Sequence, residues 1–121
     1  MYLGIISSIF GILFIFSGIA GFMPQFYSNG MLFGIFEVNA LHNGINIIVG
    51  VIALLSSFKF KVDRLFFRVF GILFGLLSIA GIVMEGNLII AHVNMPENVL
   101  HVFIAVIFLV LGFTADRDGR M

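Results

Sequence analysis

The stretch "LGIISSIFGILFIFSGIAGFM", Leu3–Met23, decides the fold class, because it runs for 21 residues without a charged side chain. A helix needs about 20 apolar residues to cross the hydrocarbon layer of a membrane. Three further apolar stretches of similar length follow it, namely Ala40–Phe58, Phe66–Met84 and Glu97–Thr114. The sequence therefore predicts an all-α bundle of four transmembrane helices.

The composition of the whole chain agrees with this assignment. Of its 121 residues, 61% are apolar and 10% are charged, whereas a soluble domain has about 45–50% apolar and about 25% charged residues. The mean hydropathy is +1.22, so we expect a single membrane domain, residues 1–121, whose apolar surface is covered by the lipid bilayer. The zero net charge gives no reason to expect nucleic acid as a partner. The absence of cysteine excludes disulfides and thiolate metal sites.

The basic residues predict how the chain is oriented in the membrane. All six lysines and arginines lie around the middle loop or in the C-terminal tail: Lys59, Lys61, Arg64, Arg68, Arg117 and Arg120. The other two loops, Pro24–Val38 and Glu85–Pro96, contain none. Because positive residues stay on the cytoplasmic side, we expect both termini and the middle loop to be cytoplasmic.

The two halves of the chain share short motifs. "FGILF" begins at positions 10 and 70 and "IAG" at positions 19 and 79, an offset of 60, while Asn43 matches Asn98 at an offset of 55. Each half, about 3–58 and about 66–114, contains two predicted helices. The sequence therefore predicts two parallel α-hairpin repeats related by a pseudo-two-fold axis along the membrane normal.

This internal repeat also predicts contacts between the halves. At the offset of 55, Glu37 matches His92 and His42 matches Glu97, so an acid twice corresponds to a histidine. Equivalent residues near a two-fold axis lie opposite one another. We therefore expect His42 and Glu97 to approach each other across the axis, with Asn43 near Asn98.

A second group of polar residues lies at the starts of two predicted helices. Asn39 and Asn94 each stand directly before a helix and are good N-caps. Glu97, three residues after Asn94, has the spacing of a capping box. The next polar residues lie one to two turns inside, on one helix face at spacings of four and seven: Asn43, Asn46, Asn98 and His101. They predict a polar network inside the bundle, which either sets the helix register or forms a ligand site.

The ionisable residues raise the question of a metal. The candidate ligands are His42, His92, His101, Glu37, Glu85 and Glu97. Glu97 and His101, four residues apart on one helix, form a half-site suited to zinc, iron or manganese. Because no predicted helix carries two histidines at this spacing, we assign no cofactor. A metal held by His42, Glu97 and His101 and a proton relay stay as alternatives. Catalytic motifs are absent from the sequence, so we expect no enzymatic activity.

Small residues predict where helices pack closely. Gly4, Gly11 and Gly18 recur every seven residues, and Gly71 and Gly75 form a G-x-x-x-G motif. These seams predict a protein that acts by association, as a homo-oligomer or with another membrane protein. The alternative is binding or transport of a small solute, a proton or a metal at an outer-face polar site between the second and fourth helices. The short apolar segment "MLFGIF", residues 31–36, predicts an interfacial or re-entrant segment near that site.

Two segments resemble a known family. "FEVNALHNGINIIVGVIAL" and "VNMPENVLHVFIAVIFLVLGF" are similar to the second and fourth helices of small bacterial membrane proteins grouped as domain of unknown function 4383. The likeness extends over about residues 11–113. The family pattern N-x-x-H-N-x-x-H is matched by Asn39, His42 and Asn43, with Asn46 where histidine is usual, which weakens a two-histidine metal site. The resemblance implies a protein of the bacterial inner membrane and no particular activity.

Overall fold

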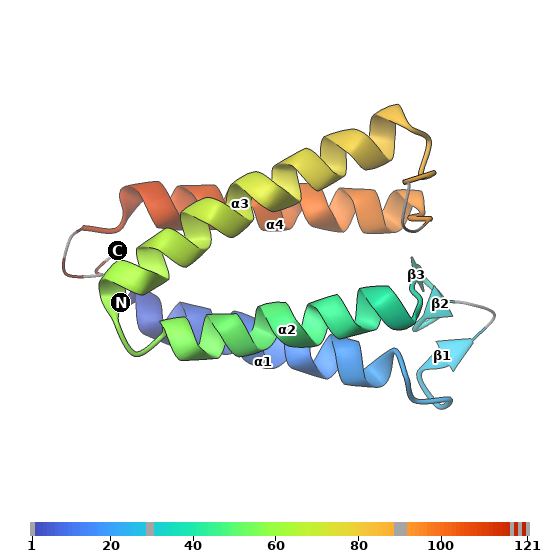
Figure 1. Cartoon of the computed structure of the whole chain (residues 1–121), viewed down its shortest axis with the longest axis horizontal. Helices are drawn as coiled ribbons and strands as arrows, with labels where there is room; N and C mark the ends of the chain where they lie inside the picture. The colour runs from blue at the N-terminus through green and yellow to red at the C-terminus, as the bar shows by residue number, and fades with distance from the viewer. Residues whose placement is uncertain (1, 29–30, 89–91, 117, 119, 121) are drawn as a thin grey trace.

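The computed structural model describes residues 2–28, 31–88, 92–116, 118 and 120, and its main elements are four helices (Figure 1). They are α1 Leu3–Ala20, α2 Ala40–Ser56, α3 Phe60–Val83 and α4 Met95–Thr114. The predicted helical fold with four helices is confirmed. However, α3 begins six residues before the predicted Phe66, because the helix continues through a charged turn that hydropathy assigned to the loop.

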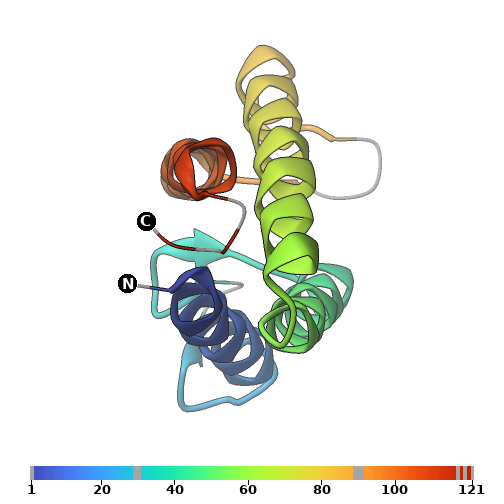
Figure 2. The ribbon, with the colours of Figure 1, turned by 90° about the vertical axis from the view of Figure 1, so that its left-hand side faces the viewer.

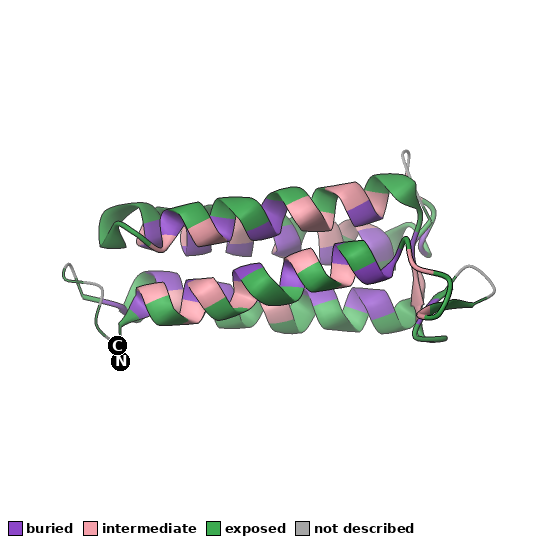
Figure 3. Cartoon of the chain, turned by 90° about the horizontal axis from the view of Figure 1, so that it is seen from below, coloured by how far each residue is buried: buried purple, intermediate pink, exposed green. Residues whose placement is uncertain are grey.

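Three of the helices, α1, α3 and α4, are long and apolar enough to cross a membrane. α2 is shorter, with 17 residues, or about 25 Å at a rise of about 1.5 Å per residue. The outer faces of the helices are exposed (Figure 3). They carry large apolar side chains such as Leu55, Leu76 and Phe103. Apolar side chains outside and buried polar side chains inside indicate a membrane protein.

The four helices form two hairpins. α1 packs along α2, and α3 packs along α4 (Figures 1 and 2). Both termini and the α2–α3 connection lie at one end of the bundle, which we call the termini end. The loop between α1 and α2 and the loop between α3 and α4 lie at the other end, which we call the sheet end.

Glycines allow the helices within each hairpin to approach closely. A methyl group at Gly11 would lie 2.9 Å from the Gly50 carbonyl oxygen, and one at Gly71 would lie 2.9 Å from Leu109 Cγ. Cβ atoms essentially never come that near, so a side chain at either position would displace a neighbour: the Gly50 backbone on α2 or the Leu109 side chain on α4. The small residues predicted to form seams are therefore used inside the hairpins at these positions.

Phenylalanines fill the middle of the bundle and join the two hairpins. Phe108 on α4 is fully buried, and its ring centroid lies 4.9 Å from those of Phe10 and Phe67 in edge-to-face contacts. Phe74 and Phe14 stack at 5.7 Å beside them. Buried aromatic rings in such contacts contribute both apolar area and specific geometry.

Residues 31–36, for which the sequence predicts an interfacial or re-entrant segment, belong to a small antiparallel sheet at the sheet end. Its strands are β1 Tyr27–Ser28, β2 Met31–Leu32 and β3 Phe36–Glu37, in the order β1-β2-β3. The β2–β3 turn passes through Phe33 and Gly34, whose φ values are 55° and 71°. The described residues do not include 89–91 of the loop between α3 and α4, or Arg117 of the predicted basic tail.

Candidate functional site

The two asparagines predicted as N-caps start the helices that carry the site. Asn39 Oδ1 accepts a hydrogen bond of 2.8 Å from the His42 amide at the start of α2. Asn94 Oδ1 accepts one of 3.2 Å from the Glu97 amide at the start of α4. Both caps are therefore confirmed. They hold His42 and Glu97 in the first turns of α2 and α4, at the sheet end.

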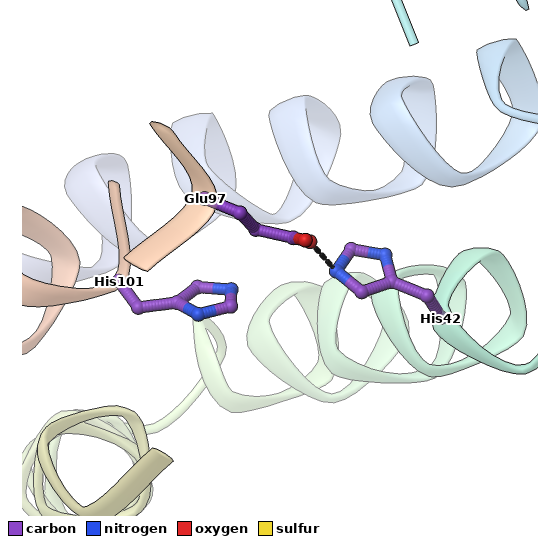
Figure 4. A group of neighbouring side chains, drawn as sticks. All are labelled: His42, Glu97 and His101. Carbon is purple, nitrogen blue, oxygen red and sulfur yellow. Dashed lines mark ion pairs between the residues drawn. The ribbon is translucent and has the colours of Figure 1, made fainter. Parts of the chain in front are cut away.

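The site is a cluster of His42, Glu97 and His101, of which the last two are buried and His42 is partly buried. His42 Nε2 on α2 pairs with Glu97 Oε1 on α4, which confirms the contact expected from the internal repeat. His101 lies one turn further along α4, and its ring stacks beside that of His42 with centroids 6.3 Å apart. Figure 4 shows all three side chains pointing toward one region between the helices. Glu97 is 1% exposed and His101 5%.

This cluster leaves several buried polar atoms without a hydrogen-bond partner in the described part of the chain. They are the two Glu97 carboxylate oxygens and His101 Nδ1. Of the two oxygens, Oε1 makes the ion pair with His42, and Oε2 has no such contact with a described residue. An unsatisfied buried polar group typically costs about 1–3 kcal/mol. The arrangement is therefore suited to receiving a proton, a cation or a polar ligand group. It also offers one ligand atom from each of three residues, all within 4.8 Å of one another.

The remaining polar residues have different surroundings. Asn46 Nδ2 lies 3.4 Å from His42 Nδ1, so this amide orients the His42 ring. Asn43 Oδ1 packs against Gly21, which caps the C-terminal end of α1. Asn98 Oδ1 packs against Gly81 on α3. Each of these two amides thus faces the partner helix of its own hairpin, and the expected approach of Asn43 to Asn98 stays a prediction.

A cavity of about 280 Å³ adjoins the cluster. Its polar end is formed by His42, Asn46, Glu97 and His101. The remaining wall comes from α1, the sheet and α4, and it is apolar apart from Ser17: Phe10, Leu13, Phe14, Ser17, Leu32, Phe33, Phe36, Val38, Leu100 and Ile104. An apolar cavity with a few convergent polar groups has the usual composition of a small-molecule site.

The other predicted ionisable candidates lie outside this cluster. Glu37 on β3 and His92 contact each other, with Oε2 2.6 Å from Nδ1, and both are partly exposed. Asn94 Nδ2 also donates a hydrogen bond of 2.8 Å to the Ile35 carbonyl. These two contacts tie the sheet to the start of α4. Glu85 is exposed in the turn after α3.

Sequence reasoning missed several residues that shape this region. Gly21 and Gly81 receive the two buried amides, and they are the last residues of the repeated "IAG" motif, which was the available signal. Asp63 in the first turn of α3 is fully buried near Gly4, although its charged neighbours suggested a solvated loop. The aromatic wall of the cavity carries no sequence signal, because phenylalanine is frequent throughout the chain.

Comparison with known proteins adds one match. A family model described as "Domain of unknown function (DUF4383)" matches residues 5–114. The chain belongs to this family. The matched range includes all of α2, α3 and α4, all but the first two residues of α1, and every residue of the His42, Glu97 and His101 cluster. No curated protein and no solved structure matches the chain.

Proposed function

We propose that this protein is a membrane protein that binds a small solute in the cavity at the sheet end of the bundle. The observation that carries the proposal is the convergence of three ionisable residues at one end of that cavity: Glu97 and His101, which are buried, and His42, which is partly buried. Ionisable residues inside a membrane domain are costly and mark sites of function. The cluster supplies charge and hydrogen bonds, and the apolar wall holds the remainder of the solute.

The size and surroundings of the cavity narrow the kind of solute. Sites for drug-sized ligands have volumes of about 300–1,000 Å³, so a cavity of about 280 Å³ suits a smaller molecule. The rim residues Leu13 and Phe33 are about half exposed, which favours entry of a largely apolar molecule. Toward the termini end, Phe108 packs against Phe10 and Phe67. This packing favours binding over passage through an open pore.

The fluorescent apolar amine 1-aminoanthracene tests the proposal on the full chain in lipid nanodiscs. We expect saturable binding that Ser17→Phe abolishes, because a phenyl ring at Ser17 fills the cavity. Ser8→Phe is the matched control: both serines lie on α1, are partly buried and donate to the carbonyl four residues before them. Binding that is equal in the two variants, or a wild-type signal no greater than that of empty nanodiscs, would refute the proposal.

We also propose that the four helices form two parallel repeats that span a bacterial inner membrane with both termini in the cytoplasm. Matching contacts support the repeat: Gly11 meets Leu54 as Gly71 meets Leu109, and the members of these pairs are offset by 60 and 55 residues. The concentration of lysine and arginine near the α2–α3 connection supports the orientation. Labelling of single cysteines introduced at Ser57 and Ser28 from each side of intact cells tests it, and external labelling at Ser57 would contradict it.

Association with itself or with another membrane protein stays a separate prediction. The small residues that suggested it are in part used within the hairpins, as at Gly11, Gly50 and Gly71. Gly44 on α2 has open space around it, so a second helix can approach closely there. Cross-linking in native membranes tests this prediction, and a purely monomeric pattern would contradict it.

A further inference from the structure

We propose that His42, Glu97 and His101 together bind one divalent first-row transition-metal ion, such as Zn²⁺, Mn²⁺ or Fe²⁺. This inference rests on the proposed function, because the ion would form the polar end of the same cavity. The three residues come from two helices that start at the same end of the bundle. Their ligand atoms lie within 4.8 Å of one another.

The spacing of the donors is close to what one ion requires. Zinc binds imidazole nitrogen and carboxylate oxygen at about 2.0–2.2 Å, so the ligands of a tetrahedral ion lie about 3.3 Å apart. Figure 4 shows that the three side chains point toward one another. An ion between them would separate His42 Nε2 from Glu97 Oε1, which contact each other directly. Both helices are capped directly before the cluster by Asn39 and Asn94, so the backbone that carries the ligands is held in place.

Burial supplies the physical reason for a cation. Glu97 is 1% exposed and His101 5%, and a buried carboxylate needs a compensating charge. His42 contacts one Glu97 oxygen. The other oxygen and His101 Nδ1 have no hydrogen-bond partner among the residues that the structure describes. A single divalent ion would satisfy the carboxylate and both imidazoles together.

The donor types select the class of ion. Two imidazoles and one carboxylate suit zinc, iron and manganese, whereas calcium takes six to eight oxygen ligands and copper(I) prefers sulfur. Three protein ligands leave at least one coordination position open, as in zinc sites that bind a water or a substrate. All three residues line the cavity. The open position would therefore face the cavity, where a solute with one oxygen or nitrogen donor can bind.

Asn46 acts as a positioning residue in this arrangement. Its side-chain amide lies 3.4 Å from His42 Nδ1. The nearer amide atom is Nδ2, which donates to Nδ1. A rotation of the Asn46 amide by about 180° would bring its oxygen to this position to accept from His42 Nδ1–H, and would leave the lone pair of Nε2 free for the ion. Ligating histidines commonly donate their second N–H in this way, and loss of such a partner costs about 10–100-fold in metal affinity.

The test is a titration of the purified full chain in detergent, stripped of metal with a chelator, with Co²⁺ followed by competition with Zn²⁺. Co²⁺ absorbs visible light with an intensity that rises in four-coordinate sites, so it reports geometry as well as binding. We expect one Co²⁺ per chain, displaced by Zn²⁺ and unaffected by Ca²⁺ or Mg²⁺. His42→Gln, Glu97→Gln and His101→Gln should each weaken binding more than about 100-fold, and Asn46→Leu about 10–100-fold.

His92→Gln is the matched control, because His92 also contacts a glutamate but is partly exposed at the surface. It should bind Co²⁺ like the wild type, and circular dichroism should show that every variant keeps its helices. Absence of metal binding in the wild type, or equal binding in Glu97→Gln and His92→Gln, overturns the inference. Binding of 1-aminoanthracene by the same metal-free samples separates the outcomes: probe binding without metal binding leaves the proposed function standing, and loss of both overturns both.

Discussion

Two glycines that look alike in the sequence should respond in opposite ways to alanine. A methyl group at Gly50 on α2 would lie 2.6 Å from both Gly11 O and Ile15 Cγ1 on α1. One at Gly75 on α3 would lie 3.8 Å from its nearest neighbour, Ala105 Cβ, which is ordinary contact. We therefore expect Gly50→Ala to force α1 and α2 apart and Gly75→Ala to fit without movement.

The size of the effect follows from two terms. Alanine stabilises a helix interior by about 1 kcal/mol relative to glycine, and this gain is common to both variants. Overpacking costs about 1–3 kcal/mol, and only Gly50→Ala incurs it. The free energy of unfolding of Gly50→Ala should therefore lie about 1–3 kcal/mol below that of Gly75→Ala, and Gly75→Ala should be at least as stable as the wild type.

Reversible unfolding in mixed micelles with increasing dodecyl sulfate, followed by circular dichroism, measures this difference directly. Gly71→Ala should fall between the two, because its nearest contact is the flexible Leu109 side chain at 2.9 Å. Equal stability of Gly50→Ala and Gly75→Ala would refute the packing of α1 on α2 described above. Lower stability of Gly75→Ala than of the wild type would refute the open space beside α3.

Three further predictions use the same unfolding measurement. Phe108→Ala should lower the free energy of unfolding by about 3–5 kcal/mol, because loss of its fully buried ring leaves a cavity. Phe103→Ala, at 62% exposure, should change it by less than about 1 kcal/mol. Similar losses in the two variants would contradict the placement of Phe108 in the core. Asn39→Ala should cost about 1 kcal/mol by removing the cap on α2, and no loss would mean that the cap is dispensable. Glu37→Gln should cost less than about 1 kcal/mol, since its pairing with His92 is exposed, and a larger loss would contradict that exposure.

Local sequence signals predicted the features that depend on one segment at a time. Hydropathy over about 20 residues located the four helices, and single residues such as Asn39 and Asn94 located the starts of two of them. The match of His42 with Glu97 at a constant offset also predicted a contact between residues 55 positions apart. A repeat carries this information because it relates positions in one hairpin to positions in the other.

The same local sequence signals did not predict the early start of α3 or the small sheet. Hydropathy does not distinguish a charged helical turn from a loop, so it placed the start of α3 at Phe66 instead of Phe60. The strands of the sheet are two residues long, which is too short for a periodic pattern. Their formation depends on pairing with one another and on the left-handed turn at Phe33 and Gly34.

The sequence by itself determined the helical membrane class, the polar character of one end of the bundle, and which acid meets which histidine, because these follow from hydropathy, capping and the repeat. Tertiary structure alone decided that Asn43 and Asn98 fit against Gly21 and Gly81, and that a cavity lies beside the cluster. A cavity is the space left over when side chains from several elements pack together. Its position depends on their combined volumes and directions, which no single segment of the chain contains.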